Sequence, residues 1–199
     1  MFSPRQLAAL VVATSFAAGL NLYATVATLG LLARADVIAL PPSLSVLTSW
    51  WIIAASVALY LIEFVADKIP AVDLVWNALQ TFVRVPVAAL LAYGATMQLP
   101  LGEQLIATAV GGAIALAAHG GKTAARVAVT PSPEPFSNIA LSLGEDAVAV
   151  VLTWLAMQHP YWAAAIAGVF IVVIVALIRA VTRALRVVFR RAERQLTSA

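Results

Sequence analysis

Ionisable side chains inside apolar stretches are the residues of this sequence best placed to do chemistry. Glu63 and Asp67 are four residues apart, so they lie on one face of a helix, and Glu63 falls within an apolar run. His119 and Lys122 are three residues apart, with two glycines between them. Because an ionisable group at membrane depth is costly, it normally faces a bundle interior or a water-filled cavity. These positions therefore predict a buried polar site.

Two segments that a shift of 61 residues brings into register carry further polar groups. The shared pattern is a proline, an acid three positions later and an asparagine four positions after that. It falls on Pro70, Asp73 and Asn77 in the first segment and on Pro131, Glu134 and Asn138 in the second. The same shift sets Arg84 opposite Glu145. We predict an internal repeat with units at about 44–99 and 103–158.

The two segments, residues 70–84 and 131–146, are short and too polar to cross lipid alone. Non-helical backbone at membrane depth is tolerated only where protein or water surrounds it. We therefore expect two re-entrant or interfacial segments that enter from the cytoplasmic side, within two parallel units. If the segments crossed the membrane fully, the two units would instead be inverted relative to each other.

The candidate substrate- or ion-binding site collects the polar groups of both units. Its members are Glu63, Asp67, Lys68, Asp73, Asn77, Arg84, His119, Lys122, Arg126, Glu134, Asn138, Glu145 and Asp146. Prolines at the segment starts predict helix N-termini that attract anions, and the acids could bind a cation or a proton. The alternative is a set of structural ion pairs and headgroup anchors at the membrane interface.

A metal site is a further hypothesis for the same residues. Glu63, Asp67 and His119 supply oxygen and imidazole ligands, but their spacing is not diagnostic of any metal. The chain has no cysteine, which removes disulfides and thiolate ligands. No HExxH, GxSxG or P-loop pattern is present, so we expect no enzyme activity and no cofactor.

Composition indicates that the elements carrying these residues lie in a membrane. The 199 residues are 63% hydrophobic and 11% charged, whereas soluble domains are about 45–50% apolar and about 25% charged. A chain of this length cannot bury so much apolar surface away from water. Composition therefore argues against a soluble enzyme, a disordered chain and a nucleic-acid binder.

Apolar runs predict an all-α, polytopic membrane protein with about six transmembrane helices in one domain, residues 1–178. The runs cover residues 7–33, 44–62, 85–102, 104–118 and 147–178, and the last must turn back near His159 to give two spans. Gly19-Leu-Asn21 is expected to break or kink the first run. Pro86 is expected in the first turn of the third helix.

Basic residues predict the orientation. Half of the twelve follow Ile178: Arg179, Arg183, Arg186, Arg190, Arg191 and Arg194. With both termini in the cytoplasm, this tail, Lys68, Lys122 and Arg126 lie inside, as expected for a bacterial inner-membrane protein. Residues 179–199 then form a basic amphipathic extension that lies against anionic lipid.

Three strings resemble one known family: Gly19-Leu-Asn21-Leu-Tyr23-Ala-Thr25, Glu63-Phe-Val-Ala-Asp67-Lys68-Ile-Pro70-Ala-Val-Asp73, and His119-Gly-Gly-Lys122 through Pro133-Glu134-Pro135-Phe-Ser-Asn138. The family is domain-of-unknown-function family 4126, a group of bacterial polytopic membrane proteins. The resemblance covers nearly the whole chain apart from the arginine tail, and it implies no activity. The proline-and-acid segments also look, in architecture alone, like those of DedA-type proteins that move lipid phosphates.

The leading hypothesis is a transporter or lipid-carrier translocase with a polar, cytoplasm-facing cavity for a small ion, an anion or a phosphate-bearing substrate. The repeat and the clustered charges favour it over the alternative, a non-transporting membrane scaffold or accessory subunit whose arginine tail recruits a partner. Expected partners are the lipid bilayer and anionic lipid, with no nucleic acid, and homo-oligomer formation stays open.

Overall fold

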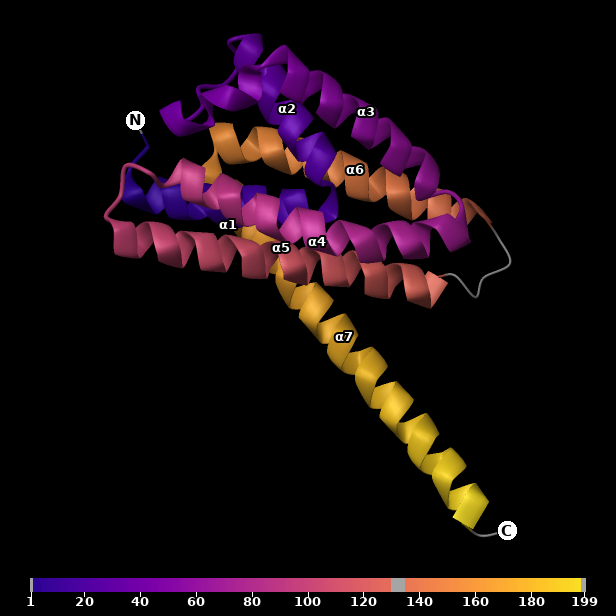
Figure 1. Ribbon diagram of the computed structural model, residues 1–199. Helices are drawn as coiled ribbons and strands as arrows, with labels where there is room; N and C mark the ends of the chain where they lie inside the picture. The colour runs from indigo at the N-terminus through magenta and orange to yellow at the C-terminus, as the bar shows by residue number, and fades with distance from the viewer. Residues whose placement is uncertain (1, 130–134, 198–199) are drawn as a thin grey trace.

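The computed structural model describes residues 2–129 and 135–197, and that part of the chain is helical with no strand (Figure 1). The elements are α1 (Pro4–Leu20), α2 (Leu22–Arg34), the short 3-10 helix η1 (Pro42–Thr48), α3 (Trp50–Ala66), α4 (Pro70–Ala95), α5 (Leu101–Val129), α6 (Pro135–Gln158) and α7 (Pro160–Thr197). The predicted all-α class is confirmed.

Four helices of the described residues are long and apolar enough to cross a membrane. The spanning stretches are Val75–Ala95, Leu101–Ala125, Ile139–Gln158 and Pro160–Ala180. A fifth is obtained if η1 and α3, which are bent by 65° relative to each other, count as one broken span. These helices indicate a multi-pass membrane protein, but the predicted count of six spans is not reproduced.

The missing span is the first apolar run, which is broken at Asn21 as the sequence predicts. Asn21 has an extended backbone, and its side-chain oxygen accepts a hydrogen bond from Ala24 N at 2.9 Å, capping α2. At 1.5 Å per residue, α1 and α2 are only about 26 and 20 Å long, too short to cross about 30 Å of hydrocarbon. Residues before α1 and after α2 line one pocket, so α2 runs back toward the start of α1 (Figure 1).

The described parts of the two polar segments are the beginnings of long helices rather than separate elements. The first is the beginning of α4, which continues without interruption to Ala95 with Pro86 inside the helix, so the prediction of a helix start at Pro86 is wrong. The described part of the second is the beginning of α6. Their polar side chains have partners on other helices, which lets a polar stretch belong to a long helix. The two-unit repeat itself stays a prediction.

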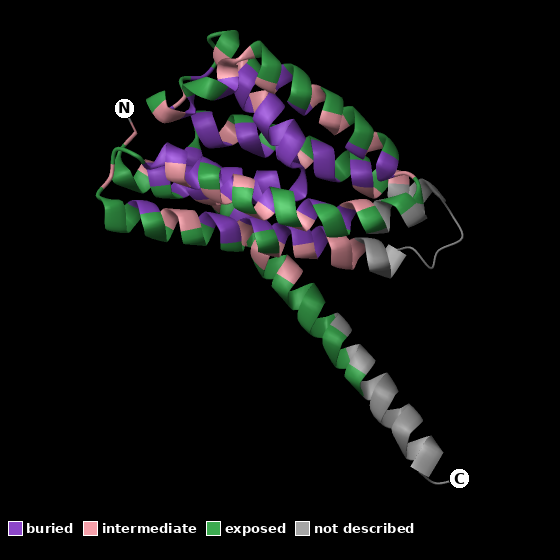
Figure 2. Cartoon of the chain, viewed as in Figure 1, coloured by how far each residue is buried: buried purple, intermediate pink, exposed green. Residues whose placement is uncertain are grey.

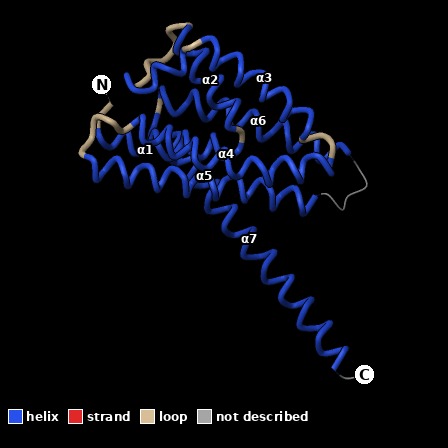
Figure 3. The backbone as a smooth tube through the Cα atoms, in the orientation of Figure 1, coloured by secondary structure: helices blue, strands red, loops and turns tan. Residues whose placement is uncertain are grey.

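Side-chain contacts define the two ends of the bundle. Gln98 donates a hydrogen bond to the carbonyl of Phe2, and Gln158 donates one to that of Val37. The N-terminus, the segment after α2 and the connections α4–α5 and α6–α7 therefore lie at one end, as the loops in Figure 3 show. The α3–α4 connection lies at the other end, and α7 leads the C-terminus away from the N-terminus (Figure 1). This arrangement does not support the prediction that both termini lie on one side.

The core surrounds α1, which is buried along most of its length (Figure 2). It packs against α4, α5, α6 and α7 through two apolar clusters that contain Leu10 and Phe16. A Cβ atom on Gly19 would lie 2.5 Å from the carbonyl oxygen of Ala115. Only a glycine at position 19 therefore allows the end of α1 to lie this close to α5. The close approach places the break at Asn21 next to polar residues of the other helices.

Candidate functional site

Six charged side chains are buried together beside the break between α1 and α2, and we call them the charge cluster. They are Glu63 and Asp67 at the end of α3, Arg84 in α4, Lys122 in α5, and Glu145 and Asp146 in α6. Each of these residues is at most 8% exposed. The cluster is therefore closed to solvent in this structure, whereas the sequence predicted that these residues line an open cavity.

Arg84 joins α4 to both α3 and the break. Its Nη2 atom forms an ion pair with Glu63 Oε1. Its Nη1 atom donates to the carbonyl oxygen of Leu20 at 3.1 Å and lies 3.0 Å from His119 Nδ1. Leu20 is the last residue of α1, where carbonyl groups lack helical partners and the helix dipole is negative. A guanidinium group satisfies both requirements of this helix end.

His119 links α5 to α4 with a defined tautomer. Arginine can only donate, so Nδ1 of His119 accepts from Arg84 and its other ring nitrogen carries the proton. The Nε2–H group then donates to the carbonyl oxygen of Asn77 at 2.9 Å and to the hydroxyl oxygen of Thr81 at 2.8 Å. His119 is thus a neutral connector, and within the described part of the chain no three His, Asp or Glu residues are grouped to hold a metal ion.

Lys122 is the centre of the cluster. Its Nζ atom lies 3.0 Å from Asp67 Oδ2, 3.1 Å from Glu63 Oε1 and 3.5 Å from Glu145 Oε2. It also donates to the carbonyl oxygen of Leu20 at 3.4 Å. One ammonium group of α5 therefore contacts acids of α3 and α6 together with the end of α1.

Asp146 faces the break from α6. The Nδ2 atom of Asn21 donates to its Oδ1 atom at 2.8 Å, and the Tyr60 hydroxyl lies 3.4 Å from its Oδ2 atom. Asn21 uses its oxygen to cap α2 and its nitrogen to bind α6. The side-chain amide of Asn21 therefore caps α2 at the break and also joins the break to the charge cluster through Asp146.

The cluster has an excess of negative charge. The buried side chains that the structure describes include four carboxylates but only two basic groups, with His119 neutral, so the formal charge is −2. Glu63 Oε2 and Arg84 Nε are buried without a hydrogen-bond partner from the described residues. Among these described side chains negative charge exceeds positive charge, and a buried charge without compensation is costly.

Comparison with known proteins supports the resemblance seen in the sequence. The model of a family described as a domain of unknown function (DUF4126) matches residues 8–180. The chain belongs to the DUF4126 family. Searches of curated proteins and of solved structures give no match. Every residue of the charge cluster lies within the part matched to DUF4126, and the arginine tail beyond Ala180 lies outside it.

Most of the predicted site residues meet in this DUF4126 chain. Seven of them are linked by direct contacts or through a shared partner: Glu63, Asp67, Arg84, His119, Lys122, Glu145 and Asp146. The backbone carbonyl of Asn77 accepts a hydrogen bond from His119. Lys68 donates to the carbonyl of Phe64 at 2.7 Å and packs on the ring of Phe64. Glu134 and the side chains of Asp73, Arg126 and Asn138 lie outside what the structure describes.

Three contributors were missed as members of the site: Asn21, Tyr60 and Ser142. Tyr60 precedes Glu63 by three residues, and Ser142, which donates to Asp67 Oδ2 at 3.4 Å, precedes Glu145 by three. That spacing places each on the face of a predicted site residue and could have found them. Asn21 was predicted to break the first run, but its partner on α6 could not be read from the sequence.

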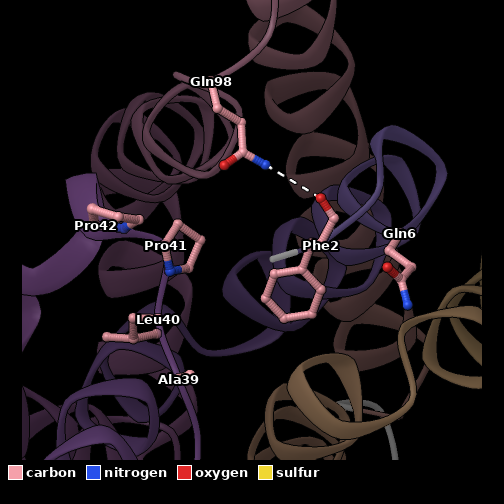
Figure 4. A pocket seen from close by; sticks show the side chains of 7 residues that line it. All are labelled: Phe2, Gln6, Ala39, Leu40, Pro41, Pro42 and Gln98. Carbon is pink, nitrogen blue, oxygen red and sulfur yellow. Dashed lines mark hydrogen bonds between the residues drawn. The ribbon is translucent and has the colours of Figure 1, made fainter.

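A separate pocket of about 450 Å³ lies at the N-terminal end of the bundle (Figure 4). It is lined by Phe2, Gln6, Gln98 and residues 39–42. Its polar groups are two amides, one of which bonds the carbonyl of Phe2. The pocket has no charged lining residue and shares no residue with the charge cluster.

Proposed function

We propose that this protein is a transporter of a small ion and that the charge cluster is its ion-binding element. The observation that carries the proposal is the end of α1 at Leu20, inside the bundle, where its carbonyl oxygen binds both Arg84 and Lys122. Discontinuous helices that end within the membrane form the substrate and ion sites of many transporters. Such irregular backbone is tolerated only where protein buries it or a cavity lies beside it.

The charge balance favours a positively charged ion over an anion or a phosphate-bearing substrate. An anion would need free basic groups, but Lys122 already contacts three carboxylates and Arg84 pairs with one of them. Adding negative charge to a buried site that is already negative is unfavourable. Adding a positive charge would compensate the excess.

The ion pairs couple ion binding to movement of the helices. Lys122 holds α5 against α3 and α6, and Arg84 holds α4 against α3. A positive charge that neutralises one carboxylate weakens the attraction of that carboxylate for Lys122. Packed helices respond to such a change by shifting between discrete arrangements, which is the requirement for alternating access.

We place the end with the α3–α4 connection in the cytoplasm of a bacterium. Lys68 and Lys122 lie toward this end, and α7 leads its arginines away from the opposite end (Figure 1). Cytoplasmic segments carry an excess of Lys and Arg. In this orientation the N-terminus lies on the far side, and two basic residues, Arg5 and Arg34, lie near it.

Currents from proteoliposomes adsorbed on a solid-supported membrane test the proposal. Separate concentration jumps of Na⁺, K⁺, Cl⁻ and inorganic phosphate, and a jump of pH, should give a current with at least one cation or with protons. Glu63→Gln and Lys122→Met should abolish this current in protein whose circular dichroism matches that of the wild type. Glu103→Gln, at an exposed acid in the first turn of α5, is the matched control and should keep it. Currents no larger than those of empty liposomes, or currents unchanged by both cluster variants, would contradict transport.

A scaffold role is the second candidate, because α7 continues to Thr197 beyond the bundle (Figure 1). Arg179, Arg183 and Arg186 are exposed, and their spacing places them on one helix face. Such a basic stripe suits anionic lipid or an acidic partner. Deleting residues 179–199 separates the candidates: a transporter keeps its current, whereas a scaffold without transport activity loses its partner in a pull-down.

A further inference from the structure

We infer that Asp146 binds a proton in the folded bundle, so that its carboxyl group is neutral at neutral pH while the other three acids of the cluster pair with Lys122 and Arg84. The inference concerns the same cluster as the proposed function and rests on it for the role of the proton as the transported or coupling ion. Proton binding itself can be measured without any transport.

Among the described side chains, Asp146 is the acid of the cluster that has no basic partner. Lys122 contacts Glu63, Asp67 and Glu145, and Arg84 contacts Glu63. Among the side chains that the structure describes, no basic group lies within ion-pair distance of Asp146, although the residue is only 5% exposed. A buried carboxylate without a positive partner gains a proton rather than remain charged.

The two neighbours of Asp146 suit a neutral acid. A protonated carboxyl group has one oxygen that accepts and one O–H group that donates. Asn21 donates to Oδ1 at 2.8 Å, which is the accepting side. The Tyr60 hydroxyl lies 3.4 Å from Oδ2, and a hydroxyl oxygen can accept the O–H group as readily as it can donate. Both oxygens of the neutral acid therefore have a partner of the right kind.

Burial is the main factor that favours the neutral form of Asp146, which is only 5% exposed. Glu63 and Asp67 of α3 act in the same direction, whereas the Asn21 hydrogen bond and Lys122 of α5 stabilise the charged form. The remaining basic group of the cluster, Arg84, is paired with Glu63. Independently, Glu63 Oε2 is fully buried without a hydrogen-bond partner from the described residues.

A proton fits this position better than a metal ion. A metal ion needs several oxygen or nitrogen ligands, and the described residues hold no group of three His, Asp or Glu that could supply them. One of the two neighbours of Asp146 is the N–H group of Asn21, which cannot act as a ligand. A proton requires only one carboxylate oxygen and one acceptor.

The position of Asp146 gives the proton a structural effect. On release, the O–H bond at Oδ2 breaks and the proton goes to water, which leaves a carboxylate beside the acids of α3. That carboxylate competes with Asp67 and Glu145 for Lys122. Because Asn21 holds Asp146 to the break, loss of the proton changes the attraction between α5, α6 and the end of α1.

Infrared spectroscopy of the full chain in lipid tests the inference. Aspartate labelled with ¹³C at the side-chain carboxyl group lowers the C=O stretching frequency of any protonated Asp. We expect a protonated-carboxyl band at neutral pH that shifts with the label and is lost in Asp146→Asn. Asp36→Asn is the matched control, because Asp36 is exposed and its positive φ of 55° suits asparagine. This control should keep the band.

Tyr60→Phe provides a second readout that does not depend on removing the acid. It deletes the neighbour of Oδ2, so the band should remain but move to higher frequency as the O–H group loses its acceptor. No label-sensitive band at neutral pH in the wild-type protein, or a band of full intensity in Asp146→Asn, would overturn the inference.

The two proposals fail in different ways. If Asp146 is protonated but proteoliposomes give no ion current, the transport proposal is wrong and the proton site stands. If currents depend on Glu63 and Lys122 but the carboxyl band is absent, the transport proposal stands and the proton site is wrong.

Discussion

The side-chain amide of Asn21 donates a hydrogen bond to Asp146 at 2.8 Å, although the two residues are 125 positions apart. The same amide caps α2 through its oxygen. One residue therefore ends the first apolar run, starts the helix that turns back and attaches both to α6. The break in the chain and the charge cluster are for this reason parts of one structure.

Replacement of Asn21 by alanine should lower the free energy of unfolding by about 2 kcal/mol. The variant loses a helix cap, worth about 1 kcal/mol, and a buried hydrogen bond of similar value. Thermal unfolding followed by circular dichroism in detergent measures the loss. Gln98→Ala, which removes a 3.4 Å hydrogen bond at the exposed end of the bundle, is the control. Equal midpoints for the two variants would show that the cap and its bond to α6 contribute nothing.

The pair Arg84 and Glu63 should show strong coupling in a double-mutant cycle. Both side chains are fully buried, so Arg84→Met alone leaves an acid with reduced compensation and should cost about 3–5 kcal/mol. Adding Glu63→Met should recover part of that cost, because the acid that lost the Arg84 guanidinium is then absent as well. Unfolding of the four proteins in the cycle measures the coupling energy. Additive losses would mean that the two charges act independently.

Two lysines near the same end of the bundle should respond differently to methionine. Lys122→Met removes an ammonium group that contacts three carboxylates, and it should cost several kcal/mol or prevent stable folding. Lys68→Met removes a partly exposed group that donates to the carbonyl of Phe64, and it should have a smaller effect because water screens an exposed charge. Yield after membrane extraction and the thermal midpoint compare the two variants. A loss at Lys68 as large as that at Lys122 would contradict the central role of Lys122.

Two glycines test the close approach of α1 to α5. A Cβ atom at position 19 would lie 2.5 Å from the backbone oxygen of Ala115, so Gly19→Ala must separate the helices and should cost about 1–3 kcal/mol. A Cβ atom at position 120 meets nothing within 4 Å. Gly120→Ala should therefore stabilise the protein by about 0.5–1 kcal/mol through helix propensity. Thermal unfolding of both variants should give midpoint shifts of opposite sign.

Several features of the fold follow from local sequence alone. Apolar composition and run length predict a helical membrane protein, and the spanning helices agree with that prediction. The small residue and the amide at Gly19 and Asn21 predict the break, because an asparagine side chain can replace the next helical hydrogen bond with one of its own. Helical spacing predicts that Glu63 and Asp67 share a face, and Lys122 contacts both.

The polar segments show where local reasoning fails. Judged alone, a stretch with Asn77, Gln80 and Arg84 is too polar to begin a spanning helix. In the structure Gln80 bonds Tyr23 of α2, and Arg84 bonds α1 and α3. The partners remove the cost of burying these groups, so α4 continues through them and through Pro86. A prediction that treats the polar stretch and the apolar run after it as separate segments therefore misplaces the start of this helix.

By itself the sequence determined the class of protein, the break at Asn21 and the small set of charges that burial would bring together, because these depend on composition and on residues a few positions apart. Only the tertiary structure decided how the charges pair. Among the described residues, Asp146 has no basic group within ion-pair distance, whereas Lys122 on another helix contacts Glu63, Asp67 and Glu145. Pairing depends on distances between helices, and no local pattern in the chain contains them.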